Sequence, residues 1–277
     1  MLTFTENEPF SPIKYQYTVE KILYKGKSQF QEIMIFESPD FGRVFVLDNI
    51  VQLTERDEFF YHEMLTHIAM HTHPNPRKVI VIGGGDGGTM REVLKHSCVE
   101  KAYLVEIDKK VVEVARKYLS FVSCKLDDPR VEIHYSDGSE FIKSIKDVDV
   151  IIVDSTDAIG MARTLYSEEF FNNIFECLSS DGIYVTHSES LGFHREMAIE
   201  VQSTLKKIFP IVDLYSFPIP TYPGNWWSFA IASKKFDPRI PNKKLVPDTK
   251  IYDHEVHKWV FLPKTLYSKI MNQEVQW

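Results

Sequence analysis

The chain has 277 residues, of which 44% are hydrophobic and 26% are charged, and these fractions are typical of a folded globular protein rather than a disordered one. Its 32 Lys and Arg residues against 39 Asp and Glu residues leave a net charge of −7, which argues against a protein that binds nucleic acid. No apolar run approaches the roughly 20 residues that span a membrane, and the beginning of the chain is acidic where a signal peptide is basic. We therefore expect a cytoplasmic protein.

The three cysteines argue against both a disulfide framework and a thiolate zinc site. Cys98, Cys124 and Cys177 are odd in number, and none of them forms a C-x-x-C pair. A reducing compartment fits this usage.

The first 55 or so residues predict a small β domain. They are rich in Thr, Val, Ile, Phe and Tyr, and turn signals such as Lys25-Gly26 and Ser38-Pro39-Asp40 separate their apolar runs. A helical pattern follows over residues 57–71 and ends before Pro74. We therefore expect two domains, 1–56 and 57–277.

From residue 78 onward, buried-strand patterns alternate with amphipathic helical ones, which predicts a parallel sheet with helices on both faces. The expected strands are 79–82, 102–105, 131–135, 148–153, 183–186, 211–217 and 228–232, and the expected helices are 90–96, 111–119, 167–178 and one that ends at 209. Only a Pro-rich loop joins the last two strands, and parallel neighbours need a longer crossover, so the final strand should be antiparallel. After residue 234 we expect a surface linker and a packed tail around 259–262.

A glycine-rich turn follows the first strand of that sheet and begins a helix. The turn reads GGGDGG from Gly83 to Gly88, and Glu106 stands eighteen residues further on, at the end of the next strand. Glycines such as Gly83 and Gly85 allow a ligand to approach the backbone, and an acid at this place can accept both ribose hydroxyls. The pattern predicts a nucleoside site.

Asp86 separates two classes of nucleoside ligand. In a dinucleotide site the pyrophosphate lies against this turn, and a carboxylate inside the turn would repel it. A sulfonium nucleoside with a cationic tail would be attracted instead. Asp86 therefore favours a sulfonium nucleoside.

Further acids stand where other strands end, so all of them should meet at one edge of the sheet. They are Asp86, Glu106, Asp137, Asp154, Asp157 and Glu189. Each alone could cap a helix, but together they predict a site for a polycationic substrate. Glu63, His67 and His71 share a helical face, a weaker pattern that is seldom a metal site.

Several stretches match a known family. They are Phe30-Gln31, Leu47-Asp48, Asp57-Glu58-Phe59, Tyr61-His62-Glu63-Met64, THPNPRKVIVIGGGDGGTMREVLKH from Thr72 to His96, Val105-Glu106-Ile107-Asp108, Leu126-Asp127-Asp128-Pro129-Arg130-Val131, Asp137-Gly138, Asp154-Ser155-Thr156-Asp157 and Pro220-Thr221-Tyr222-Pro223. From about residue 10 to about 262 the chain thus resembles the polyamine aminopropyltransferases, with the spermidine synthases as the nearest group.

The resemblance implies a Rossmann-like domain of methyltransferase type after the N-terminal β domain, assembled as a homodimer or homotetramer. It implies transfer of an aminopropyl group from decarboxylated S-adenosylmethionine, the co-substrate, to an amine such as putrescine. No prosthetic group and no metal are implied, and the partners are small molecules.

The resemblance also assigns residues. Gln31, Glu106 and Asp137-Gly138 would hold the nucleoside beside the glycine turn, and Asp86 would bind the aminopropyl ammonium. Asp154 would be the catalytic residue, and the residues lining the amine channel would be Tyr61, His62, Asp154, Asp157 and Tyr222.

The sequence departs from the family pattern in the loop after the fourth strand, where Ala158 and Met161 replace two prolines. We expect a less constrained loop there, which leaves open whether the amine is putrescine, cadaverine, agmatine or spermidine. Two other functions remain as alternatives: a polyamine N-methyltransferase using S-adenosylmethionine, and a non-catalytic polyamine-binding protein. The presence of both Asp154 and Tyr222 argues against the second.

Overall fold

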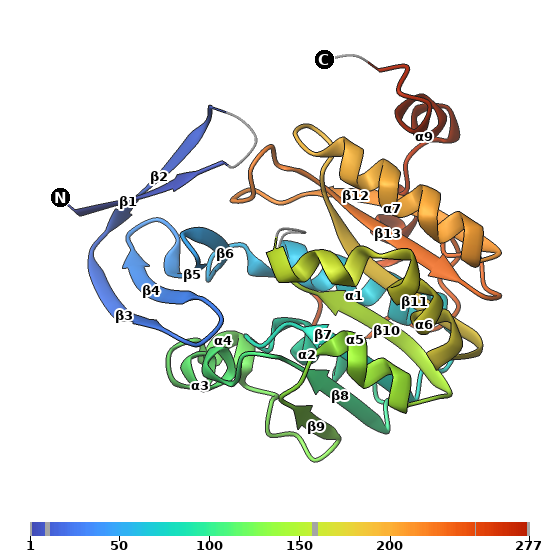
Figure 1. Ribbon diagram of the computed structural model, residues 1–277, viewed down its shortest axis with the longest axis horizontal. Coiled ribbons are helices and arrows are strands. Elements are labelled where there is room, and N and C mark those ends of the chain that lie inside the picture. The colour runs from blue at the N-terminus through green and yellow to red at the C-terminus, as the bar shows by residue number, and fades with distance from the viewer. Residues whose placement is uncertain (1, 9–11, 157–159, 247, 276–277) are drawn as a thin grey trace.

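The computed structural model describes residues 2–8, 12–156, 160–246 and 248–275. The N-terminal part is built from antiparallel strands that lie to one side of the main sheet (Figure 1). The strands of the first pair are β1 (Leu2–Asn7) and β2 (Lys14–Val19), and a four-stranded sheet contains β3 (Lys21–Lys27), β4 (Glu32–Ser38), β5 (Gly42–Leu47) and β6 (Ile50–Thr54). Side chains alternate along β4, so that Ile33 and Ile35 pack with residues of the helices that follow β8.

The main sheet has seven strands in the order β12-β13-β11-β10-β7-β8-β9. Its strands are β7 (Lys78–Gly83), β8 (Lys101–Val105), β9 (Val131–His134), β10 (Val148–Asp154), β11 (Leu178–Ser190), β12 (Ile211–Pro218) and β13 (Trp226–Ser233). Five of them, from β11 to β9, are parallel neighbours, whereas β13 runs antiparallel to both β11 and β12. This confirms the predicted fold class, including the antiparallel last strand.

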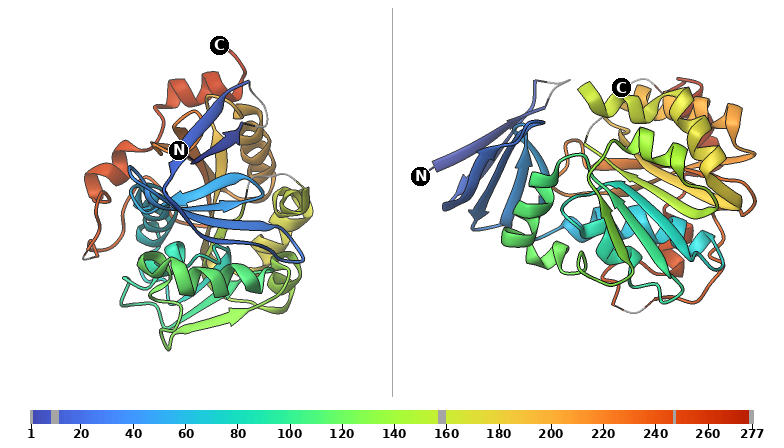
Figure 2. Two further views of the ribbon diagram at one scale, coloured as in Figure 1. Left: turned by 90° about the vertical axis from the view of Figure 1, so that its left-hand side faces the viewer. Right: turned by 60° about the horizontal axis from the view of Figure 1, so that its bottom comes forward.

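Helices cover both faces of this sheet (Figure 2). They are α1 (Glu58–Thr72), α2 (Gly88–Val93), α3 (Lys109–Tyr118), α4 (Ser120–Ser123), α5 (Gly138–Phe141), α6 (Glu168–Cys177) and α7 (Arg195–Ile208), with 3₁₀ turns at η1 (Ile142–Ser144) and η2 (Gly160–Tyr166). Along β7, Val79 and Val81 pack toward α1 and α2, whereas Ile80 and Ile82 pack toward α6 and α7. None of the helices in the described part of the chain has the length and apolar character to cross a membrane.

The end of the chain is more regular than the sequence predicted. The helices α8 (His254–Trp259) and α9 (Lys264–Met271) follow the linker, and Asp253 caps α8 by accepting from the backbone N–H groups of Glu255 and Val256. Both helices are short, so their apolar spacing gives little signal. Phe261 and Leu262 are buried, as expected for a packed tail, whereas Trp259 at the start of that stretch is 68% exposed.

Candidate functional site

The carboxyl ends of the parallel strands bring the predicted acids to one edge of the main sheet. Asp86 follows β7, Glu106 follows β8, Asp154 ends β10 and Glu189 lies near the end of β11. Glu106, Asp154 and Glu189 are each less than one-tenth exposed. Asp157 lies outside the described residues, as does Ala158, and the side chain of Met161 is not described either.

Both carboxylate oxygens of Asp154 accept hydrogen bonds from side-chain hydroxyls. Its Oδ1 accepts from the hydroxyl of Tyr61 at 2.9 Å, and its Oδ2 accepts from the hydroxyl of Thr89 at 2.6 Å. Burial, together with repulsion by Asp86, raises the pKa of the Asp154 carboxyl above its ordinary value. Asp154 is therefore a carboxylate with an increased affinity for a proton.

Asp86 is shifted the other way. Burial opposes ionisation of Asp86, but its interactions with His62 and with the backbone N–H of Gly88 outweigh burial and lower its pKa. The Gly88 N–H donates to Asp86 Oδ1 at 2.8 Å, and Nε2 of His62 lies 3.5 Å from the same oxygen. Two neighbouring carboxylates thus differ in proton affinity, which is a common arrangement in sites of acid–base chemistry.

His62 carries the positive charge of this cluster. Its Nδ1 lies 2.6 Å from Oε2 of Glu58, one turn earlier on α1. Burial alone would lower the pKa of His62, but interactions with Asp86 and Glu58 raise it to about 10. His62 is therefore an imidazolium at neutral pH.

The glycine turn leaves room for these side chains. A Cβ atom on Gly88 would lie 2.3 Å from Cε1 of His62, and one on Gly85 would lie 2.8 Å from Oε2 of Glu106. Gly83 has a φ of 78°, which is the left-handed region that favours glycine. The motif predicted from ligand approach is thus also required by the acids and the histidine around it.

Glu106 and Gln31 lie on a second part of the rim. Glu106 Oε1 accepts from the N–H of Asp108 at 2.8 Å, and burial raises the pKa of Glu106 to about 7. Gln31 Nε2 donates to Oδ2 of Asp108 at 3.0 Å. The N-terminal domain is thereby joined to the edge of the main sheet where Glu106 lies.

Asp137 is the N-cap of α5, and Gly138 is the first residue of that helix. The Asp137 carboxylate accepts from the N–H of Ser139 at 2.7 Å and so caps the helix, and its side chain is exposed. A Cβ on Gly138 would lie 2.3 Å from Cγ2 of Ile82. Capping of α5 gives Asp137 a structural role, and close packing against Ile82 gives Gly138 one. A contact of either residue with a nucleoside would be a second role.

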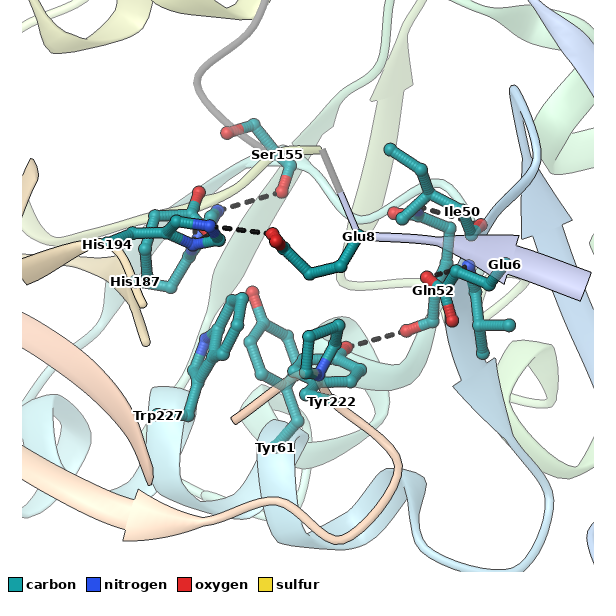
Figure 3. A pocket seen from close by; sticks show the side chains of 13 residues that line it. Glu6, Glu8, Ile50, Gln52, Tyr61, Ser155, His187, His194, Tyr222 and Trp227 are labelled. Carbon is teal, nitrogen blue, oxygen red and sulfur yellow. Dashed lines mark hydrogen bonds and ion pairs between the residues drawn. The ribbon is translucent and has the colours of Figure 1, made fainter. Parts of the chain in front are cut away.

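A cavity of about 520 Å³, including the part open to solvent, lies next to Tyr61 (Figure 3). The residues lining it are Glu6, Glu8, Ile50, Val51, Gln52, Tyr61, Ser155, His187, Glu189, His194, Tyr222, Pro223 and Trp227. Tyr222, predicted for the amine channel, is among them, and its hydroxyl donates to the carbonyl of Gln52 at 2.6 Å.

Glu8, Glu189 and His194 form the acidic far wall of this cavity, and of these three the sequence predicted only Glu189. Glu8, from the end of the N-terminal strand pair, points toward His194, with 2.8 Å between Oε1 and Nε2 (Figure 3). Nδ1 of His194 lies 3.7 Å from Glu189 Oε2. The two partners of the Glu8 pair are 186 residues apart, so no local pattern could have found it. Thr89 was also missed, although it stands directly after the glycine turn.

Two groups of side chains have the compactness of a metal site. His67, His71 and His96 each offer a ring nitrogen within 4.8 Å of the others, but His67 is hydrogen-bonded to both His96 and Glu92, and Glu92 already pairs with Arg91 and Lys95. Burial lowers the pKa of His96, and the cations Lys243 and Lys95 lower it further, so the charges around this group disfavour a divalent ion. Glu63 lies apart from this group, because it accepts from the backbone N–H groups of residues 250–252.

The second compact group contains His62, Asp86 and Asp154. Since both ring nitrogens of His62 face carboxylates, they carry protons rather than lone pairs that could bind a metal. This chemistry suits a cationic organic substrate better than a metal ion.

The mostly parallel sheet, its glycine turn and the acids along its edge define the class of protein, a Rossmann-like enzyme of methyltransferase type. Two family models match this chain: the spermine/spermidine synthase domain over residues 58–244 and the spermidine synthase tetramerisation domain over residues 2–55. The chain belongs to the spermine/spermidine synthase family, the polyamine aminopropyltransferases, which confirms the resemblance and the enzyme class predicted from the sequence.

Relatives match along nearly the whole chain. Polyamine aminopropyltransferase 1 of Aquifex aeolicus is 51% identical over 277 residues, which are 100% of this chain and 99% of the relative. The polyamine aminopropyltransferase of a Hydrogenobaculum species is 53% identical over 270 residues, 97% of this chain and 96% of the relative.

Solved structures agree with these matches. A spermidine synthase in complex with the transition-state analogue AdoDATO superimposes with a TM-score of 0.92 at 41% identity, covering 98% of this chain and 95% of that one. Spermidine synthase from Thermotoga maritima gives a TM-score of 0.89 at 40% identity, covering 98% and 94%. The family uses decarboxylated S-adenosylmethionine as co-substrate. The family model that matches residues 2–55 describes a tetramerisation domain.

Proposed function

We propose that this enzyme transfers the aminopropyl group of decarboxylated S-adenosylmethionine to putrescine and releases spermidine, methylthioadenosine and a proton. One observation carries the proposal: Asp86 and Asp154 lie side by side, with pKa values displaced in opposite directions, next to a cavity with further carboxylates. The first carboxylate suits a fixed cation, and the second suits a nucleophile that must lose a proton.

We assign the nucleoside to the rim between the glycine turn and β9. Glu106 would accept both ribose hydroxyls, and Gly83 and Gly85 would let the ligand approach the backbone. Gln31 and Asp137-Gly138 would complete the nucleoside pocket. Asp86 would bind the ammonium of the aminopropyl tail. The buried position of Glu106 beside Gly85 supports this assignment.

The transfer needs little activation of the electrophile. The amine lone pair forms a bond to the propyl carbon next to the sulfonium, the electron pair of the breaking C–S bond stays on sulfur, and the leaving group is a neutral thioether. The nucleophile is the harder part, because an alkyl ammonium with a pKa near 10.4 must lose a proton, which costs about 4.6 kcal/mol at pH 7.

Asp154 would accept that proton. A carboxylate with an ordinary pKa near 3.9 is a weak base for an ammonium, so the raised pKa of buried Asp154 supports its role as a catalytic base. Tyr61 and Thr89 would orient it, since their hydroxyls occupy one carboxylate oxygen each.

The amine would lie in the cavity between Asp154 and the acidic far wall. Tyr61 and Tyr222 line this cavity, and His62 and Asp157, the remaining predicted channel residues, would contribute near the reacting end.

Glu8 and Glu189 would attract the second ammonium of a diamine, a role supported by their burial. His194 lies between them. Burial alone would lower its pKa, but Glu189 and Glu8 outweigh burial and raise it.

Incubating the protein with decarboxylated S-adenosylmethionine and a panel of amines, with product masses measured, tests the function. We expect spermidine from putrescine as the main product. Because Ala158 and Met161 replace prolines, we also expect measurable use of cadaverine, agmatine or spermidine. The variant Ala158→Pro with Met161→Pro should narrow the profile toward putrescine. Methyl transfer from intact S-adenosylmethionine without aminopropyl transfer would overturn the proposal.

Three further proposals concern the whole molecule. The separate matches of two family models, to residues 2–55 and 58–244, support domains 1–56 and 57–277. The match to a tetramerisation domain supports a homo-oligomer, and we propose a homodimer or homotetramer. The composition supports a cytoplasmic enzyme.

A further inference from the structure

Four charged side chains alternate in sign along a buried line that ends at the reacting centre. Arg91 donates from Nη1 to Glu58 Oε1 at 2.9 Å and from Nη2 to Glu58 Oε2 at 2.8 Å, a two-pronged pair that only a guanidinium can make. Glu58 holds Nδ1 of His62 at 2.6 Å, and Nε2 of His62 lies 3.5 Å from Asp86 Oδ1. The side chains of Glu58 and His62 are 2% and 3% exposed.

The geometry fixes the protonation of His62. A neutral imidazole has a single N–H, so one of its nitrogens would present a lone pair to a carboxylate. The Glu58 side chain is 2% exposed and the Asp86 side chain 13%, and this shielding from water makes such a contact costly. With Glu58 in place, the ring keeps both protons and donates to both sides.

Glu58 itself is outside the cavity, and so is Arg91. Arg91 is fixed on its other sides, because Nη1 donates to the carbonyl of Phe121 and Nε donates to Glu92. The contacts that Glu58 makes toward the reacting centre, among the described residues, run through His62, which lies against Asp86, and the direct effect of the Glu58 charge on Asp86 is to raise the pKa of Asp86.

We propose that Glu58 is a positioning residue: clamped by Arg91, it holds the imidazolium of His62 against Asp86, so that Asp86 stays the anion for the cationic tail and Asp154 is left to take the amine proton. The kinetic part of this inference rests on the proposed function, whereas its electrostatic part does not.

The sign of the expected pH effect follows from the groups around His62. Three acids face His62: Glu58 on the same helix, and Asp86 and Asp154 at the strand ends. Arg91 lies behind Glu58. The centre of the Tyr61 ring lies 5.4 Å from the centre of the His62 ring. His62 as a cation lowers the pKa of Asp154. If His62 becomes neutral, the pKa of Asp154 rises further, and a base that must be deprotonated then works only at higher pH.

The variant Glu58→Gln keeps the shape of the side chain and removes its charge. The pKa of His62, followed by NMR of protein with ¹³C-labelled histidine and assigned through His62→Gln, should fall by about one to three units from about 10. The acid limb of the profile of kcat against pH should move to higher pH. KM for decarboxylated S-adenosylmethionine should rise. Glu113→Gln is the matched control, because Glu113 is an exposed glutamate that pairs only with Lys109 and Lys110 among the described residues; it should behave as wild type.

A Glu58→Gln protein with an unchanged His62 titration overturns the inference, even if its kcat falls equally at every pH. If that variant does not fold, Arg91→Lys gives the same test, because lysine keeps the charge and loses the two-pronged clamp; an unchanged His62 titration there also overturns it. Wild-type protein without aminopropyl transfer would instead remove the proposed function, and the His62 titration would still decide the electrostatic link.

Discussion

A Cβ atom on Gly84 would lie 2.7 Å from Oδ2 of Asp154. This is the same carboxylate oxygen that accepts from Thr89, so the glycine turn and the proposed base are fitted to each other. Gly84 also has a φ of 64°, a conformation that L side chains rarely adopt. Both the backbone and the neighbouring acid therefore require glycine.

We expect Gly84→Ala to lose stability and activity together. The left-handed backbone should cost about 1–2 kcal/mol in the free energy of unfolding, and the added methyl should push Asp154 away from Thr89, so that kcat falls. Thermal unfolding and steady-state kinetics measure the two effects. Gly192→Ala is the control, because a Cβ there has no neighbour nearer than 3.6 Å among the described atoms; equal losses in both variants would contradict the prediction.

Asp154→Asn should separate binding from chemistry. The amide keeps the size of the carboxylate but cannot accept the amine proton, so we expect kcat to fall by about a hundredfold or more while methylthioadenosine binds as before. Steady-state kinetics measures kcat, and calorimetry measures the affinity for methylthioadenosine. Near-normal turnover would transfer the proton-accepting role to Asp157 or to a water held by Tyr61.

Asp86 should make the enzyme bind decarboxylated S-adenosylmethionine in preference to intact S-adenosylmethionine. The carboxylate of intact S-adenosylmethionine would meet Asp86, and two like charges at 4 Å repel by about 4 kcal/mol at an effective dielectric constant of 20. The decarboxylated form should therefore bind about a thousandfold more tightly. Calorimetry on wild type and Asp86→Asn measures this ratio, which should shrink in the variant, with methylthioadenosine as the tail-free control. Equal affinities in wild type would favour an N-methyltransferase.

The sequence predicted the parts of the fold and site that depend on local pattern. Buried strands read as continuous apolar runs, and parallel topology places the residues after each strand at one edge. Asp86, Glu106 and Asp154 were therefore placed correctly on the rim, although their roles stay predictions.

The parts that the sequence did not predict depend on contacts between distant segments. Glu8 reaches His194 from the N-terminal strands, and no rule of spacing links a short antiparallel ribbon to a particular strand end. Glu58 was included in a matching stretch, but its charge pairs with Arg91, 33 residues away, and only the packing of α1 against α2 shows this. The pKa displacements likewise depend on burial, which spacing does not reveal.

A last prediction concerns stability in acid. His71 is fully buried, with Nδ1 bonded to the carbonyl of His67, and burial, with the nearby His67, lowers its pKa to about 2. In the unfolded chain its pKa is about 6.5. Well above pH 6.5 His71 is neutral in both the folded and the unfolded state, so it does not reduce the free energy of unfolding. As the pH falls below 6.5, His71 binds a proton in the unfolded chain but not in the folded protein. At pH 5 this linkage removes about 2 kcal/mol from the free energy of unfolding.

The variant His71→Leu should lack that part of the acid loss. Leucine fills a similar volume and cannot bind a proton, so denaturant unfolding at pH 8 and pH 5 should show a smaller decrease in the variant, by about 2 kcal/mol. The difference between the two pH values is the measured quantity, because it cancels the lost hydrogen bond to His67, which affects both pH values alike. Parallel decreases in wild type and variant would mean that His71 binds its proton in the folded protein as readily as in the unfolded chain, and that the acid sensitivity of the enzyme comes from other buried groups such as His257, whose pKa burial lowers to about 4.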